Sequence, residues 1–320
     1  MPTLYLHIGR GKTGTSLIQQ YLAERRDDLL RQGVHFVAES DGERGRGHQQ
    51  FAKSFVSSAP EFFVPATNPE LTRRKVADEL CGATSDTLIM SSENFAIADI
   101  EPLVKFFQAL PIQLVIKIIF FARSQDELAE SEYNQVVKLA GINVSLDTYA
   151  DTMIEGCDFF EVAEEWSAHF GYENMICRVY DGRNRNVINQ FLACIPEIDV
   201  AGLTSFEVEA SQSRANAAIG IRALWVARIL NSVAIDARFK SYQPVFSLLA
   251  DKDLPALHWN SQEARSYRER FAASNLAFSE RFLGVSNDDL GGRRYSVSER
   301  DRVIAEIAAL KEQLGLSRPN

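Results

Sequence analysis

The stretch Leu4–Leu17, LYLHIGRGKTGTSL, determines the fold that the sequence predicts. Its apolar, β-prone beginning leads into a loop of small residues around Lys12, and a helical pattern starts at Leu17. A strand, a glycine loop and a helix in this order form a cradle for phosphate, because glycines let backbone N–H groups approach the anion and the helix dipole attracts it. Lys12 adds a positive charge, and nearby hydroxyl groups are further donors: Thr13, Thr15 and Ser16.

The order of residues in this loop distinguishes between kinds of phosphate ligand. Gly9 and Gly14 have the separation of an ATP-type P-loop, but Thr15 follows Gly14 where that motif has lysine. The segment 11–16, GKTGTS, instead resembles the 5′-phosphosulfate loop of the sulfotransferases, usually Pro-Lys-Ser/Thr-Gly-Thr-Thr/Ser, with glycine at the proline position. The resemblance implies a binding site for the sulfuryl donor at Gly11, Lys12, Thr13, Gly14, Thr15 and Ser16.

A second pattern supports the same family resemblance. Residues 114–121, LVIKIIFF, form an apolar run that predicts a central parallel strand covered on both faces. The run leads to Arg123, and Ser131 lies eight residues later in a helical pattern. Sulfotransferases bind the 3′-phosphate of their donor, 3′-phosphoadenosine 5′-phosphosulfate (PAPS), with an arginine at a strand end and a serine eight residues on. The resemblance therefore implies that Arg123 and Ser131 bind that phosphate, through a guanidinium fork and one hydroxyl.

Strand and helix patterns alternate along the first 204 residues, which predicts an α/β fold with a parallel sheet and helices on both faces. The expected strands are 3–8, 34–37, 87–91, 113–122 and 174–180. The expected helices are 14–31, 48–57, 68–82, 100–109, 125–139, 158–170 and 184–194. Residues 205–320 look mainly helical, with helices near 214–235, 261–284 and 298–314 and a capping box at Ser296–Glu299.

We therefore expect a single sulfotransferase-like domain over 1–320, with a three-layer parallel sheet and a P-loop-like phosphate-binding loop. Its α/β core would occupy 1–204 and its helical C-terminal portion 205–320. Ligands of such sheets bind outside the carboxyl ends of the strands. The loop at 9–16, Glu93 and Arg123 all follow strand ends, so we expect them to converge on one edge of the sheet.

The composition limits the classes of function. The chain has 320 residues, of which 46% are hydrophobic and 24% charged, as in ordinary soluble globular proteins. A net charge of −9 disfavours non-specific binding to nucleic acid or to an anionic membrane. The four cysteines are widely spread, which predicts reduced residues and no metal site. Because the first strand begins at about Thr3 and no stretch approaches ~18 apolar residues, we expect no signal peptide, no membrane span and a cytoplasmic location.

The expected catalytic residues are Lys12, Glu93 and His48. If the chain is a sulfotransferase, Lys12 would stabilise the bridging oxygen as charge builds on the leaving phosphate. Glu93 follows the strand at 87–91, near the point where sulfotransferases place a catalytic His or Glu, and is the first choice as general base. His48 is the alternative, because its ordinary pKa of ~6.5 suits proton transfer and a flexible glycine loop precedes it. No metal is expected.

The resemblance predicts a soluble, bacterial-type transferase that moves a sulfuryl group from PAPS to a hydroxyl or amine and releases adenosine 3′,5′-bisphosphate. The expected acceptor is a carbohydrate or glycoconjugate, since carbohydrate-modifying members often use glutamate as the base, so the expected partner is a small molecule or a glycan. Two alternatives stay open. One is a P-loop nucleotide phosphotransferase, although the sequence offers neither a lysine after Gly14 nor a Walker-B aspartate. The other is a catalytically silent relative that only binds nucleotide. The sequence does not determine the acceptor or the oligomeric state.

Overall fold

The structure is a computed structural model that describes residues 1–39, 47–58, 64–152, 155–181, 187–203, 218–232, 254–288, 290 and 295–315. Its contacts divide the chain into two compact units. The first unit comprises Met1–Arg123, Phe159–Phe206 and Ser274–Gly292, and the second comprises Ser124–Asp158, Glu207–Ala273 and Arg293–Asn320. The units interleave along the sequence, and the single domain over 1–320 stays a prediction. Each unit is described by itself below.

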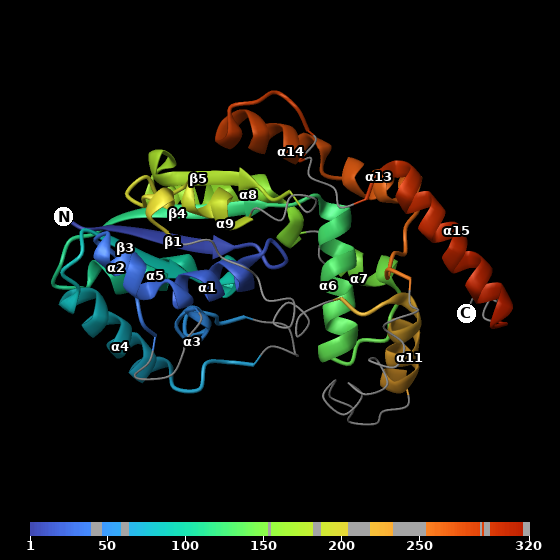
Figure 1. Cartoon of the computed structure of the whole chain (residues 1–320), viewed down its shortest axis with the longest axis horizontal. Coiled ribbons are helices and arrows are strands. Elements are labelled where there is room, and N and C mark those ends of the chain that lie inside the picture. The colour runs from blue at the N-terminus through green and yellow to red at the C-terminus, as the bar shows by residue number, and fades with distance from the viewer. Residues whose placement is uncertain are drawn as a thin grey trace. The chain divides into compact units, whose positions relative to one another are not determined.

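A parallel sheet forms the centre of the first unit (Figure 1). Its strands are β1 (Thr3–Gly9), β2 (Val34–Phe36), β3 (Thr87–Ser91), β4 (Val115–Ala122) and β5 (Met175–Val179). They lie in the order β2-β3-β1-β4-β5, and every neighbouring pair is parallel. The sheet confirms all five strands that the sequence predicts, with ends that differ by no more than two residues.

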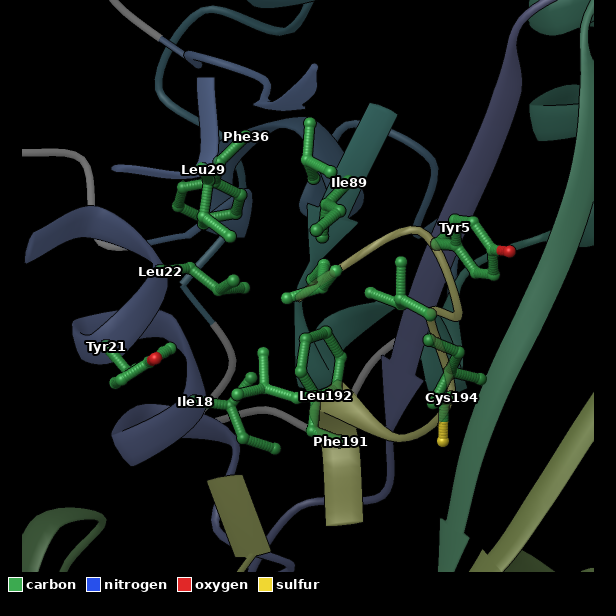
Figure 2. Close-up of a cluster of buried hydrophobic side chains, with 14 of the residues drawn as sticks. Tyr5, Ile18, Tyr21, Leu22, Leu29, Phe36, Ile89, Phe191, Leu192 and Cys194 are labelled. Carbon is green, nitrogen blue, oxygen red and sulfur yellow. The ribbon is translucent and has the colours of Figure 1, made fainter. Parts of the chain in front are cut away.

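The sheet is covered on both faces because its central strands are apolar on both faces. In β1, Leu4 through Ile8 are fully buried, and β4 is fully buried from Ile118 to Ala122. Tyr5 and Phe121 belong to a buried cluster that includes Ile18 of α1 (Thr15–Glu24) and Phe191 of α9 (Val187–Leu192). Figure 2 shows Tyr5, Ile18 and Phe191 in this cluster.

The opposite face of the sheet carries Phe120. Its ring meets Phe159 of α8 (Phe159–Phe170) and Phe278 of α14 (Ala272–Phe278) edge-on at 6.0 Å between centroids. Helices therefore lie on both sides of the sheet, which confirms the three-layer α/β prediction.

The remaining regular elements of the first unit connect these layers. They include the helices α2 (Arg26–Arg31), α3 (Gln49–Lys53), α4 (Pro69–Gly82) and α5 (Ile100–Gln108). Four short helical turns lie at Glu93–Ile97, Tyr172–Asn174, Val200–Gly202 and Ser279–Leu283. The sequence predicts one helix over 14–31, but the structure has two, because the backbone at Arg25 leaves the helical region with φ −104°. The other predicted helices of residues 48–194 are confirmed, although some are shorter at their ends. Of the helix expected at 184–194, residues 184–186 lie outside the described residues.

The second unit is helical. It contains α6 (Gln125–Leu139), α7 (Leu146–Thr152), a turn at Glu155–Cys157, α11 (Ile221–Ser232), α13 (Ser261–Glu269) and α15 (Val297–Gln313). The predicted capping box is confirmed: the Ser296 hydroxyl accepts from the Glu299 N–H at 3.3 Å, and the Ser296 N–H donates to the Glu299 carboxylate at 2.8 Å. Of the helix expected at 214–235, residues 214–217 and 233–235 lie outside the described residues.

Buried ion pairs join the helices of the second unit. Asp126 of α6 is fully buried and lies 2.8 Å from the guanidinium of Arg268. Glu130, one turn further along α6, pairs with Arg300 of α15 at 3.0 Å and accepts the backbone N–H groups of His258 and Trp259. Burial nevertheless raises the pKa of Glu130, and this desolvation outweighs the effect of Arg300. Removing one partner of such a pair leaves a buried charge, so α6, α13 and α15 depend on one another.

Candidate active site

The loop after β1 has the backbone geometry of an anion-binding nest. Gly9, Lys12 and Gly14 all adopt left-handed conformations, with φ of 77°, 66° and 84°. Lys12 is the only residue other than glycine with a positive φ in the described part of the chain. A lysine in this conformation is strained by about 1–3 kcal/mol, and such strain is concentrated at functional sites. Alternation of left- and right-handed residues turns successive N–H groups toward a common centre.

The N-terminus of α1 adds to this nest. Gly14 is the N-cap, no described side chain caps the helix, and the first turn holds no acidic residue. A helix N-terminus without a side-chain cap leaves first-turn N–H groups that an anion can satisfy. The hydroxyl of Thr15 is buried and has no hydrogen-bond partner among the described residues. A buried hydroxyl without a partner is unfavourable, so Thr15 fits a ligand that supplies one. Ser16 is exposed at the same helix end.

Glu93 lies against the loop, as the sequence predicts from the strand ends. It begins the helical turn Glu93–Ile97 directly after β3, and the preceding Ser92 N–H donates to the carbonyl of His7 in β1 at 3.0 Å. A Cβ atom built on Gly9 would lie only 2.9 Å from the Cα atom of Glu93. The half-buried carboxylate accepts hydrogen bonds from the side chains of Gln49, at 2.9 Å, and Gln19, at 3.4 Å.

Arg123 reaches the loop from the other side. It follows the end of β4, and its Nη1 donates to the carbonyl of Lys12 at 2.6 Å. Its guanidinium lies over the ring of Tyr180, 5.3 Å from the ring centroid. Tyr180 follows β5, and its ring is 3.4 Å from the position of a Cβ atom on Gly14. The structure therefore brings the lysine loop, Glu93 and Arg123 together at the carboxyl ends of β1, β3 and β4.

From the sequence, Tyr180 is by default a packing residue at the end of a strand, whereas the structure places its ring beside Arg123 and Gly14. The signal that could have found it is its position. It follows the end of a parallel strand, as Arg123 and Glu93 do.

His48 is buried, whereas the sequence predicts a histidine beside a flexible loop. Its ring is 1% exposed, and its Nδ1 accepts the backbone N–H of Ser91 at 3.1 Å. The ring is packed edge-on against Phe36. Burial lowers the pKa of His48 to about 3, so the imidazole is neutral at physiological pH. These contacts fix the ring beneath the end of β3, and its role as general base stays a prediction.

Ser131 lies on α6, in the second unit, and is half-buried. Its pairing with Arg123 on a 3′-phosphate stays a prediction, because Arg123 belongs to the first unit. Gly11 and Thr13 lie in the loop itself, and the Thr13 hydroxyl donates to the carbonyl of Arg10 at 2.5 Å. That bond closes the loop on itself and fixes the turn that carries Lys12.

Comparisons with known proteins found solved structures at low sequence identity. No protein-family model matches the chain, and no curated protein matches it significantly. A sulfotransferase from Alicyclobacillus acidocaldarius is 11% identical, with a TM-score of 0.47 over 88% of this chain and 96% of that one. A retinol dehydratase in complex with androsterone and the inactive cofactor PAP is 12% identical, with a TM-score of 0.31 over 78% of each chain. Similarity at this level establishes neither a family nor an activity, so the interpretation depends on the residues of the site.

The arrangement combines three chemical capacities. The loop and the N-terminus of α1 offer N–H donors and one unsatisfied hydroxyl to an anion, with Lys12 and Arg123 as cations. Glu93 places a carboxylate beside the same loop, where it can accept a proton.

Among the described residues, no group of three or more His, Cys, Asp or Glu side chains is arranged to hold a metal ion. Within the same residues, no helix is both long and apolar enough to cross a bilayer.

Proposed function

We propose that this protein is a sulfotransferase that moves a sulfuryl group from PAPS to a hydroxyl or amine of an acceptor, in the cytoplasm. The observation that carries the proposal is the placement of Glu93 against Gly9, which puts a proton acceptor beside an anion-binding loop that contains Lys12. An anion-binding loop alone serves many nucleotides. A carboxylate next to it fits a reaction in which an acceptor loses a proton while the anion leaves.

The residues of the loop fit the 5′-phosphosulfate of the donor. The unsatisfied Thr15 hydroxyl and the N–H groups of the first turn of α1 would donate to its oxygens. Lys12 would lie near the oxygen that bridges phosphorus and sulfur. Arg123 would bind the 3′-phosphate, with Ser131 as its expected partner. The order Lys12-Thr13-Gly14-Thr15-Ser16 is the order of the sulfotransferase loop that the sequence resembles.

The proposed chemistry follows from these positions. The donor supplies the sulfuryl group. Glu93 takes the proton of the acceptor hydroxyl or amine while the acceptor atom forms its bond to sulfur. The bond from sulfur to the bridging oxygen breaks, and Lys12 neutralises the negative charge that this oxygen gains. The products are the sulfated acceptor and adenosine 3′,5′-bisphosphate. We propose a carbohydrate or glycoconjugate as acceptor, from the choice of glutamate as the base.

Calorimetric titration tests the donor site first. We expect adenosine 3′,5′-bisphosphate to bind tightly, and ADP and Mg·ATP to bind weakly because they lack the 3′-phosphate. Arg123→Ala should weaken binding about 10-fold or more, since charge-assisted bonds to phosphate contribute about 1.5–3 kcal/mol each. Arg74→Ala, at an exposed position of α4, is the matched control and should bind like the wild type. Equal or tighter binding of Mg·ATP would instead support a phosphotransferase.

Turnover with labelled PAPS separates an enzyme from a silent nucleotide-binding relative. With a panel of hydroxyl and amine acceptors, we expect Glu93→Gln to lower kcat by about 10²–10⁴-fold and to leave the affinity for adenosine 3′,5′-bisphosphate unchanged. A protein that binds this nucleotide but transfers no sulfuryl group to any acceptor would be the silent relative. In that case Glu93→Gln would change nothing.

A further inference from the structure

Two glutamine side chains converge on the carboxylate of Glu93 from two different helices. Gln49 is the first residue of α3, and Gln19 lies in the middle of α1, the helix that the loop begins. Their Nε2 atoms lie 2.9 Å and 3.4 Å from the same carboxylate oxygen, Oε2. All hydrogen bonds that described residues make to the Glu93 side chain reach this one oxygen. The other oxygen, Oε1, is thereby given a fixed direction.

The orientation of the Gln49 carboxamide is determined by its other bonds. Its Oε1 accepts the hydroxyl of Ser92 at 2.8 Å and also the side-chain N–H of Asn94. Because two donors meet the oxygen end of the amide, the nitrogen end must be the one that faces Glu93. Ser92 and Asn94 flank Glu93 in sequence, so the same short segment orients both partners of the hydrogen bond.

Gln19 is held by packing as well as by hydrogen bonds. The side chain is 4% exposed, and its Nε2 also donates to the carbonyl of Ser91, at 3.1 Å. A Cβ atom on Gly47 would lie 2.6 Å from Cδ of Gln19, so the absence of a side chain at 47 leaves the space that the carboxamide fills. The amide therefore has one position available between Gly47 and Ser91.

We propose that Gln19 and Gln49 are positioning residues that hold the Glu93 carboxylate by Oε2 and present Oε1 to the acceptor. This inference depends on the proposed function, in which Glu93 is the general base. An amide N–H donor stabilises a carboxylate without offering a proton that can be transferred, so it orients the base and does not compete with it. Two histidines contact Ser91: His7 of β1 and His48, which precedes α3. Both are neutral, because burial lowers the pKa of each to about 3. The Glu93 carboxylate is therefore held by hydrogen bonds from two uncharged amides.

The test begins with the hydrogen bond itself, measured as stability without any ligand. Gln49→Glu keeps the shape of the side chain and its acceptor oxygen but replaces the donor to Glu93 with a second carboxylate. We expect its urea midpoint at pH 8 to fall. Adding Glu93→Gln should restore part of it, because the double variant re-forms the 49–93 hydrogen bond with donor and acceptor exchanged, whereas Gln19 Nε2 loses its acceptor at position 93. Gln50→Glu is the matched control, since it adds the same charge on α3 where the side-chain oxygen accepts the backbone N–H of Thr67.

The role in catalysis is measured on the same variants. We expect Gln49→Glu to lower kcat about 100-fold, for two reasons. The two neighbouring carboxylates would share a proton, so Glu93 would be partly protonated and unable to accept another. Repulsion would also move the Glu93 carboxylate away from the acceptor. The affinity for adenosine 3′,5′-bisphosphate should stay within about two-fold of the wild type, because none of the hydrogen bonds that Gln49 makes to described residues reaches the loop at 9–16. The double variant should regain part of the lost stability but no activity, since it lacks a carboxylate at position 93.

The outcomes separate the inference from the proposed function. If Glu93→Gln abolishes turnover but Gln49→Glu keeps the wild-type kcat, the inference is wrong and the proposed general base stands. If Glu93→Gln is fully active, the proposed base is wrong and the inference fails with it. If Gln49→Glu lowers the affinity for nucleotide and kcat together, Gln49 supports the whole loop, and a specific role in positioning Glu93 is refuted.

Discussion

Gly9 and Glu93 touch backbone to backbone: a Cβ atom on Gly9 would lie 2.9 Å from Cα and 3.1 Å from Cβ of Glu93. The end of β1 and the residue after β3 are thus held at a separation that side-chain rotation cannot change. Because Gly9 opens the loop that we propose binds the donor, its approach to Glu93 fixes the distance between that loop and the backbone of residue 93. A proton acceptor and a leaving group that must act together need such a fixed distance.

A methyl group at Gly9 should break this contact. Gly9→Ala combines a left-handed residue, at φ 77°, with a clash against backbone, so we expect a loss of stability clearly above that of strain alone. Gly33→Ala is the matched control, because Gly33 has φ 76° and no atom within 4 Å of its Cβ position. We expect the control to lose about 1–2 kcal/mol in urea unfolding and to bind adenosine 3′,5′-bisphosphate normally. Equal losses for the two variants would show that β1 and β3 separate easily.

The backbone conformation of Lys12 should lower the stability of the protein, whereas its ammonium group should favour nucleotide binding. Its backbone is left-handed at φ 66°, which costs energy for any residue with a Cβ atom. Lys12→Gly and Lys12→Ala both remove the ammonium group, so both should bind adenosine 3′,5′-bisphosphate weakly. The glycine variant should be the more stable of the two by about 1 kcal/mol, because glycine adopts this conformation without strain. An alanine variant as stable as the glycine variant would mean that the loop relaxes when the lysine is removed.

Acid should destabilise the protein through His48. The pKa of the folded imidazole is lowered to about 3 by burial, whereas the unfolded chain has the ordinary value of about 6.5. The unfolded state therefore binds more protons between these values. Stability is complete above about pH 6.5 and falls as the pH decreases toward 3, with a slope of up to about 1.4 kcal/mol per pH unit for this one proton. His7 has a similarly lowered pKa and adds to the slope.

His48→Asn should flatten this pH dependence. Asparagine keeps an acceptor near the Ser91 N–H and has no group that titrates. We expect the variant to be less stable than the wild type at pH 8, but to lose less stability between pH 6.5 and 4, as measured by urea unfolding. His169→Asn, at an exposed position of α8, should keep the wild-type slope. An unchanged slope in His48→Asn would mean that the imidazole is protonated in the folded protein.

The sequence predicts the strands and the loop well because their signals are local. An apolar run such as 114–121 is typical of a central strand that is buried on both faces. Glycines around a lysine predict the loop between β1 and α1. The support of Glu93 could not be predicted. Gln19 and Gln49 are thirty residues apart and belong to no motif, and only the fold brings them to one carboxylate. A histidine after glycines suggests exposure, but the backbone of Ser91 holds His48 inside.

The helix α6 shows the same limit in the second unit. The sequence predicts its bounds, 125–139, and Leu128 and Tyr133 are buried. It does not predict that Asp126 and Glu130 are buried too. Their partners, Arg268 and Arg300, come from segments far along the chain, and a carboxylate is buried only where such a partner meets it.

Gly47→Ala should displace Gln19 without changing Gln19 itself. The new methyl group would lie 2.6 Å from Cδ of Gln19, which is the flexible end of a side chain, so the carboxamide should move and the backbone should not. We expect kcat to fall about 10-fold, with a small change in the urea midpoint, because the amide leaves Glu93 and the carbonyl of Ser91. Gly82→Ala, at the end of α4 with no atom within 4 Å of its Cβ position, should keep wild-type activity. In a Gln19→Ala background, which removes the carboxamide, Gly47→Ala should have no further effect on kcat, since the two changes act on one group. Additive losses would mean that Gly47 acts on the site by a route that does not include Gln19.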